Sequence, residues 1–496
     1  MGIWGTLRNK LGSVWRMLGN RQTVKDILKV DKQSSEVNDA VYQQMEDWIK
    51  LYRGYHDILH KKLVNTVMSN VTKRTRTLNL PKLVSQYIST IIFSERVDYN
   101  IEDKGIDDYL RPILDDMHFI SVLRENFEKN VCVKGGLVLK PVWDGQLGVD
   151  FIGGDDFIPT EWHDDEIVAG AFMSYSFKGG KHYTRIETHS WEDEKYVIEQ
   201  RLFKSDKREE IGKEIKITEL YPNLDERIEI PNLEEPLFVY LKPATANNLA
   251  EHSPLGISMF ANAIDSSISA DEAFDGLSDE LKALKGKLIL PQSALKQVMG
   301  DDKRTGTGRY MFDTNDPAIA IVHFGDNQNN KPEVFAPPMR VDDYISAIKI
   351  FMNIFAIQCG VSAGTFSFES LQVKTATEVI SAKSETATTK KMYEQEINTA
   401  FQKLVRAMLR IADFNNAITY KDVKVNLLFD DSVIIDDDKM EEIARTEVKE
   451  GLRSVESYLR EYRQLDDKEV VDEIARMESQ FRSAMPTFDT EEVDGS

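Results

Sequence analysis

The sequence predicts an α+β protein that is mainly helical. Apolar residues recur at three- and four-residue steps over Val341–Gln358 and again over residues 373–412, which is the spacing of helices. Between residues 131 and 245, apolar and polar residues instead alternate and glycines mark the turns, as in antiparallel strands. A chain of 496 residues, 41% of them hydrophobic, is long enough for several domains around a large core.

The composition limits the functions that the chain can have. The net charge of −21 argues against stable nucleic-acid binding, which usually needs a basic patch, whereas an acidic surface lets DNA slide. The two cysteines, Cys132 and Cys359, exclude a disulfide framework and fit a reducing compartment. Polar residues interrupt the most apolar window, residues 344–366, so it falls short of the roughly 20 apolar residues of a membrane span.

The N-terminal part is expected to be helical. Residues 1–24 carry an amphipathic stripe, for which docking on protein is preferred over binding at a membrane surface. His56 and His60 stand four residues apart in the first predicted helix, a spacing that can hold a metal ion. The pattern offers no third ligand, so ordinary packing is expected for both. The predicted helices cover residues 38–64, 80–94 and 107–130.

Antiparallel strands are expected from Val131 to about residue 245. His163, Asp164 and Asp165 suggest a metal cluster at first sight, but consecutive residues of a strand point to opposite faces. A loop apex is therefore the expected structure at these positions. The clearest strand patterns cover residues 167–177, 182–191, 196–203 and 214–220.

A helix, a small insert and a second helix follow. The first helix is expected over residues 258–284 and the second over Val341–Gln358. Residues 305–308 look faintly like a phosphate loop, but they lack its glycine-lysine ending, so a flexible loop is expected. Strands of the insert are expected at Lys287–Pro291 and near residues 309–312, 318–324 and 333–335.

The segment after the second helix begins with glycines and other small residues, which end the helix. The next helix, over residues 373–412, would be roughly 60 Å long at about 1.5 Å per residue. Small side chains dominate residues 381–389, which fits either a solvated helix middle or a close subunit contact. After it we expect a strand over residues 423–429 and an acid-rich stretch that lacks EF-hand spacing. Three helices, over residues 439–450, 454–465 and 466–481, and a disordered acidic tail over residues 483–496 are expected to follow.

The string VKTATEV at residues 373–379, the long helix behind it and the order of elements on either side resemble the portal proteins of tailed bacteriophages, of the siphophage type. The resemblance covers nearly the whole chain except the first 25 residues and the acidic tail. It implies the portal fold, with a β-rich wing over residues 25–252, stem helices over 253–284 and 341–359, a clip over 285–340, a tunnel loop over 360–372, a long wing helix and strand over 373–425 and a crown over 430–482.

The resemblance also implies a function. In this family a dodecameric ring at one capsid vertex forms the channel through which double-stranded DNA is packaged and ejected. The implied partners are other copies of the chain, the terminase large subunit, a head-completion adaptor, and the major capsid and scaffolding proteins. No enzymatic activity, cofactor, metal or membrane is implied, and the expected location is the virion, after assembly in the host cytoplasm.

Roles for individual residues follow from the same resemblance. The predicted tunnel loop has one charged residue, Glu369, and would therefore pass DNA without holding it. Phe366 and Phe368 are candidates for base contacts, although packing between adjacent loops is preferred. The tunnel-loop residues are Gly360, Ser362, Gly364, Phe366, Phe368, Glu369 and Gln372; weak contacts to the DNA backbone are expected from Lys349, Lys374, Lys303, Arg304 and Arg309, and subunit contacts from Thr375, Thr377, Glu378 and Ser381.

Three other functions are kept as alternatives: another ring of the phage neck or tail, a terminase-type enzyme subunit, and a cellular scaffold built on long helices. Neck and tail rings are usually much shorter and lack the helix–insert–helix arrangement. An ATP-driven terminase needs a phosphate loop, and the sequence has no Walker A motif, no G-x-S-x-G and no paired C-x-x-C. A closed ring would argue against the scaffold.

Overall fold

The computed structural model describes most of the chain, in two compact units. The first unit is Met1–Phe429 and the second is Asp430–Ser496. Residues 1–22 of the amphipathic segment, most of the insert and the acidic tail lie outside the described residues. These are 23–28, 32–65, 70–93, 97–208, 210–283, 287–291, 319–322, 333–335, 338, 340–366, 376–429, 444–449, 453–463, 470 and 473–476.

Helices form one side of the core of the first unit. Trp48, Leu110 and Phe127 are buried completely there. The predicted helix over residues 38–64 was wrong in its second half, because Gly54 turns the chain in a left-handed conformation (φ 79°) and a strand follows. The helices are α2 (Lys32–Tyr52), α3 (Leu80–Phe93), α4 (Lys104–Asp116) and α5 (Phe119–Asn126), which continues into a π-helix (Phe127–Cys132).

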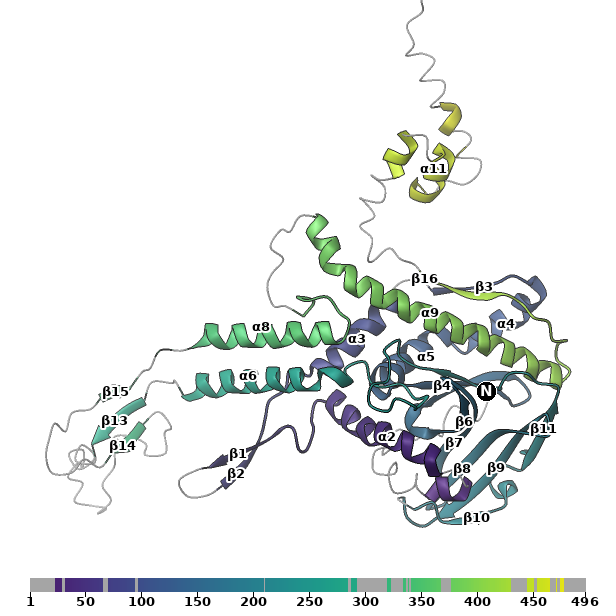
Figure 1. The fold of residues 1–496 in the computed structure, drawn as a ribbon, viewed down its shortest axis with the longest axis horizontal. Helices are drawn as coiled ribbons and strands as arrows, with labels where there is room; N and C mark the ends of the chain where they lie inside the picture. Colours follow the sequence, from purple (N-terminus) through teal and green to yellow (C-terminus); the bar gives the residue numbers. More distant parts are fainter. Residues whose placement is uncertain are drawn as a thin grey trace, which may run out of the picture. The chain divides into compact units, whose positions relative to one another are not determined.

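The predicted antiparallel region forms two sheets (Figure 1). In the smaller sheet, the strand order is β12 (Val239–Leu241), β4 (Leu137–Trp143) and β5 (Leu147–Gly153). The strands begin after the π-helix, six residues later than predicted from Val131. In the larger sheet the order is β10-β9-β8-β7-β6, with β11 also on β9; these strands are β6 (Phe157–His163), β7 (Glu166–Lys178), β8 (Lys181–Glu192), β9 (Lys195–Ser205), β10 (Lys213–Ile215) and β11 (Arg227–Pro231).

The predicted helix–insert–helix arrangement is present. Helix α6 (Ile264–Ala283) and helix α8 (Val341–Gln358) lie side by side in opposite directions, with the insert strands at their far ends (Figure 1). Helix α6 starts six residues later than predicted, because residues 261–263 form a 3₁₀ turn. Among the described insert residues, β13 (Lys287–Pro291) pairs in parallel with β14 (Ile319–Val322) and antiparallel with β15 (Glu333–Phe335).

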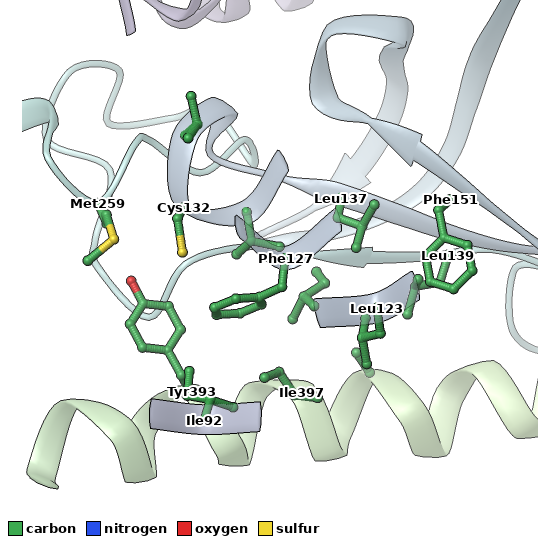
Figure 2. Packing of buried hydrophobic residues seen from close by; sticks show 14 of the residues in the cluster. Ile92, Leu123, Phe127, Cys132, Leu137, Leu139, Phe151, Met259, Tyr393 and Ile397 are labelled. Atoms are coloured by element: carbon green, nitrogen blue, oxygen red, sulfur yellow. The ribbon is translucent and has the colours of Figure 1, made fainter. Parts of the chain in front are cut away.

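Helix α9 (Ala376–Phe414) crosses the core beside both the helices and the smaller sheet. Its predicted apolar face is buried, and Tyr393 meets Phe127 edge to face, with ring centroids 5.5 Å apart (Figure 2). Beyond it, β16 (Val425–Phe429) pairs antiparallel with β3 (Val97–Ile101). No helix in the described part of the chain combines the length and the apolar character needed to cross a bilayer.

The second unit is helical where it is described. Helix α11 (Val455–Arg463) begins as predicted after Ser454, whose hydroxyl accepts a hydrogen bond from the backbone N–H of Ser457 at 3.2 Å. Tyr458 stacks on Tyr462 and accepts a hydrogen bond from Arg445. Residues 444–449 and 473–476 are also helical.

Candidate functional site

The candidate site is the loop that follows α8, together with the turns of α9 that contact it. A Schellman motif ends α8: the N–H of Gly360 bonds to the carbonyl of Ile357 and the N–H of Val361 to that of Ala356, both at 2.9 Å. Gly360 has the left-handed φ of 70° that this motif requires. The chain is thereby turned away from the helix axis, and Val361 enters the core.

A pair of buried hydroxyl residues then joins the loop to α9. The N–H of Ser362 donates to Thr386 Oγ1 at 2.9 Å, and the N–H of Thr386 donates to Ser362 Oγ at 3.2 Å. The two hydroxyl oxygens are 3.0 Å apart. Both side chains are at most 5% exposed, so each hydroxyl satisfies a backbone group that water does not reach.

Further hydrogen bonds hold the loop from both helices. Thr389 Oγ1 of α9 donates to the carbonyl oxygen of Gly360 at 2.6 Å. On the other side, Asn353 Oδ1 of α8 accepts from the N–H of Gly364 at 2.9 Å, and Thr365 Oγ1 donates to the carbonyl of Ser362 at 2.6 Å. Gly364 also has a positive φ, 84°, but faces open space. The loop therefore leaves α8 in one defined conformation.

Phe366 packs inside its own chain. Its ring meets Tyr87 of α3 edge to face, with centroids 5.8 Å apart. Burial raises the pKa of Tyr87, and hydrogen bonds with Thr386 and Thr365 offset part of that rise. The same threonines thus connect the aromatic pair to the loop. The predicted contact of Phe366 with adjacent loops stays a prediction.

The structure places the other predicted site residues unevenly. Gly360, Ser362, Gly364 and Phe366 come together as described. Lys349 lies on α8, partly buried. For Thr377, Glu378 and Ser381 the structure gives only a place on the backbone of α9. Phe368, Glu369, Gln372, Lys374, Thr375, Lys303, Arg304 and Arg309 lie outside the described residues.

Sequence reasoning missed the residues of α9 that hold the loop. Thr386 and Thr389 belong to the small-residue stretch that fitted a solvated helix or a subunit contact, and the structure gives them a third role within the same chain. Their spacing of three residues puts both hydroxyls on one helix face, which is the signal that could have found them.

The histidines that suggested metal sites take part in ordinary packing and turns. His56 Nε2 lies 3.0 Å from Asp47 Oδ1, and the backbone N–H of His56 donates to His60 Nδ1 at 2.8 Å. His163 ends β6 at the predicted turn apex, where Asp164 has a φ of 51°. Within the described residues, no three His, Cys, Asp or Glu side chains are grouped to hold a metal ion.

The first unit also contains a buried network of charged and polar side chains, separate from the loop. Lys140 Nζ donates to Glu187 Oε1 at 2.5 Å, and the same oxygen lies 2.9 Å from His189 Nε2. His189 Nδ1 is 2.8 Å from the hydroxyl of Tyr196, which accepts from the N–H of Leu237. Burial lowers the pKa of His189, so the neutral ring links Tyr196 to Glu187. Glu187, His189 and Tyr196 are each hydrogen-bonded within the network, which suits a structural role.

Comparison with protein families gives one match over nearly the whole chain. Residues 31–486 match the family described as phage portal protein, SPP1 Gp6-like. The match includes the loop, both antiparallel helices beside it and most of the second unit. No curated protein matches the chain.

Proposed function

The chain belongs to the SPP1 Gp6-like family of phage portal proteins, and on this premise we propose that copies of it form a closed ring at one capsid vertex. Portal proteins are structural components of the virion, so the chain belongs to a structural family and not to a family of enzymes. Double-stranded DNA would enter the capsid through the central channel of this ring during packaging and leave through it at ejection.

The order and pairing of α6, the insert strands, α8 and the loop carry this proposal. Two antiparallel helices that lead to a small sheet and return suit a stem with a clip at its end. We assign the clip to residues 285–340, the stem to 253–284 and 341–359, and the tunnel loop to 360–372. The wing would comprise residues 25–252 with 373–425, and the separation of the chain at Asp430 supports a crown over 430–482.

The charge of the chain suits a conduit for DNA. Every phosphate that a lysine or arginine neutralises adds salt-dependent affinity, which would slow translocation. The chain carries a net charge of −21, and residues 360–366 contain no charged side chain. The loop is also held firmly at its start, by Thr386 and Thr389, which suits a fixed attachment of the proposed channel wall to the subunit.

The partners follow from the proposed arrangement. The terminase large subunit would dock on the clip and supply ATP hydrolysis, and a head-completion adaptor would replace it after packaging. Major capsid and scaffolding proteins would surround the ring during assembly in the host cytoplasm. ATP turnover should therefore be found with the terminase large subunit, and the purified chain alone should show none.

Native mass measurement with negative-stain imaging tests the proposal. The purified chain is expected to form rings of about twelve copies with a central hole, because a head-to-tail contact whose rotation closes produces a ring. A chain that stays monomeric or dimeric at high concentration, alone and with its scaffolding protein, would contradict the ring. Intrinsic ATPase activity would favour the enzyme alternative instead.

A further inference from the structure

Helix α6 lies between two other elements. One of its faces presents Asp271, Asp275 and Asp279, one turn apart, to the hairpin formed by β1 (Lys61–Asn65) and β2 (Asn70–Arg74). Asp279 accepts from Lys73, Asp275 accepts from Arg76 at 2.7 Å, and Asp271 accepts from the N–H of Leu78 at 2.6 Å. Asp271 and Asp275 are each 1% exposed. The hairpin is therefore fixed to this face.

The opposite face of α6 holds α8. Ser266 Oγ donates to Gln358 Oε1 at 2.7 Å near one end, and Arg340 pairs with Glu280 at 2.9 Å near the other. Between them, Gly276 leaves room for the ring of Tyr344. Figure 1 shows the hairpin and α8 on opposite sides of α6. The order of the layers is hairpin, α6, α8.

The outer side of α8 carries an exposed isoleucine stripe, formed by Ile350, Ile354 and Ile357. These side chains are 57%, 40% and 51% exposed, although they stand at helical spacing on one face. Two exposed carboxylates, Asp342 and Asp343, precede the stripe at the start of the helix. The surface is thus apolar at one end and acidic at the other.

The hairpin side of the layers carries the converse surface, which we call the basic turn and which comprises residues 58–62. Asp57, just before it, pairs with Lys50 at 3.5 Å. Ile58 and Leu59 are 73% and 39% exposed, and the exposed Lys61 and Lys62 follow them closely. The turn is held to α6 at its end, where His60 Nε2 lies 3.3 Å from Asp271 Oδ2. Its surface is apolar at one end and basic at the other.

The two surfaces lie at matching heights along the helices. On α6, Asp271 contacts the basic turn and stands midway between Ser266 and Gly276. The partners of these two residues on α8 are Gln358 and Tyr344, respectively. Ile58 and Leu59 are therefore level with the isoleucine stripe. Lys62 Nζ lies 4.0 Å from Asp275, beside Gly276, so the start of β1 is level with the first turns of α8, which carry the two acidic residues. Because successive residues of a strand point to opposite faces, Lys61 points away from α6.

We propose that the isoleucine stripe of one copy packs against the basic turn of the next copy in the ring, with Asp342 and Asp343 facing Lys61. This inference rests on the proposed ring. A rotation about an axis along the helices keeps heights unchanged, so surfaces at equal height on opposite sides of one subunit meet in a head-to-tail contact that closes on itself. Apolar residues meet apolar residues, and opposite charges fix the register.

The first test uses Ile354→Asp, with Leu428→Asp as the matched control. Leu428 on β16 is 53% exposed and belongs to neither surface. Ring formation is followed by native mass against protein concentration. Ile354→Asp should raise the concentration for half assembly at least about tenfold, which corresponds to about 1.4 kcal/mol, while Leu428→Asp should assemble as the wild type does. Unchanged rings in Ile354→Asp would overturn the contact and assign the stripe to another partner.

The second test exchanges the charges. Asp343→Lys and, separately, Lys61→Glu should each weaken assembly, and the two changes together should restore it. Misfolding cannot produce such a restoration. Weakened assembly in both single variants without recovery in the double variant would overturn the pairing with the basic turn. Because the wild type is measured alongside, a failure of the whole ring proposal is seen separately, as a wild type that forms no rings.

Discussion

The hydroxyl of Thr389 donates a 2.6 Å hydrogen bond to the carbonyl oxygen of Gly360, and this bond fixes the residue that ends α8 to the long helix α9. Gly360 is the left-handed residue of the helix end, so the bond acts at the point where the chain changes direction. The conformation of the proposed tunnel loop therefore depends on a side chain that follows it by 29 positions in the sequence.

Replacing Thr389 with Val should loosen the start of the loop. Valine keeps the shape of threonine but removes the hydroxyl donor. Loss of one neutral hydrogen bond should reduce the stability of the loop conformation by about 1 kcal/mol. Backbone amides of residues 360–366 should then exchange hydrogen about fivefold faster. Thr399→Val is the control, because that hydroxyl bonds only to the carbonyl of Gln395 within α9. Equal exchange in both variants would mean that the Thr389 bond does not hold the loop.

Alanine should be tolerated differently at the two glycines of the loop. Both have positive φ, 70° and 84°, which costs roughly 1–2 kcal/mol for an alanine. At Gly360 the new methyl carbon would also lie 2.9 Å from Thr389 Oγ1, whereas at Gly364 no heavy atom lies within 4 Å. Gly360→Ala should therefore lower the thermal midpoint more than Gly364→Ala. The bulkier Gly360→Val should destabilise the fold as well. The opposite order would contradict the packing described.

Periodic elements could be predicted from the sequence, and contacts between distant segments could not. The bounds of α8 were predicted correctly, because helical spacing ends at a glycine suited to a helix C-terminus. The strands predicted over residues 167–177, 182–191 and 196–203 were also confirmed, since alternation and turn glycines are local signals. The strand predicted over residues 214–220 was wrong after Ile215, because residues 217–219 form a 3₁₀ turn. The hairpin of β1 and β2 was missed because its fixing groups, Asp275 and Asp279, lie about 200 positions away. The same holds for the threonines of α9 that hold the loop.

Acid should weaken the contact between the hairpin and α6. Hydrogen bonds from Lys73 and Arg76 lower the pKa of Asp279 below its ordinary value of 3.8. A lowered carboxyl pKa stabilises the fold above about pH 3.8, and this contribution is lost as the pH falls through the folded-state pKa. Asp279→Asn should lower the thermal midpoint at pH 7, with a cost below about 1 kcal/mol for this half-exposed group, and the difference from the wild type should shrink toward pH 3.

The control for that measurement is Glu272→Gln, which removes an exposed carboxylate from the middle of the same helix. It should leave the thermal midpoint at pH 7 close to that of the wild type. A difference between wild type and Asp279→Asn that stays constant from pH 7 to pH 3 would contradict the contribution of the charged carboxylate.

Removing one charged group of the buried network of Lys140 and Glu187 should destabilise the fold more than removing both. Burial alone would raise the pKa of Glu187, but Lys140, His189 and Arg185 hold it well below its usual range, so the group is a buried carboxylate. Lys140→Met should destabilise the fold by about 3 kcal/mol in urea unfolding, because that carboxylate loses its closest cation. Adding Glu187→Gln should recover part of the loss, since the amide oxygen can still accept from His189. The control is Lys195→Met at the protein surface, which should destabilise the fold by less than about 1 kcal/mol. If the double variant were less stable than Lys140→Met, the unpaired buried charge would not be the cause of the loss.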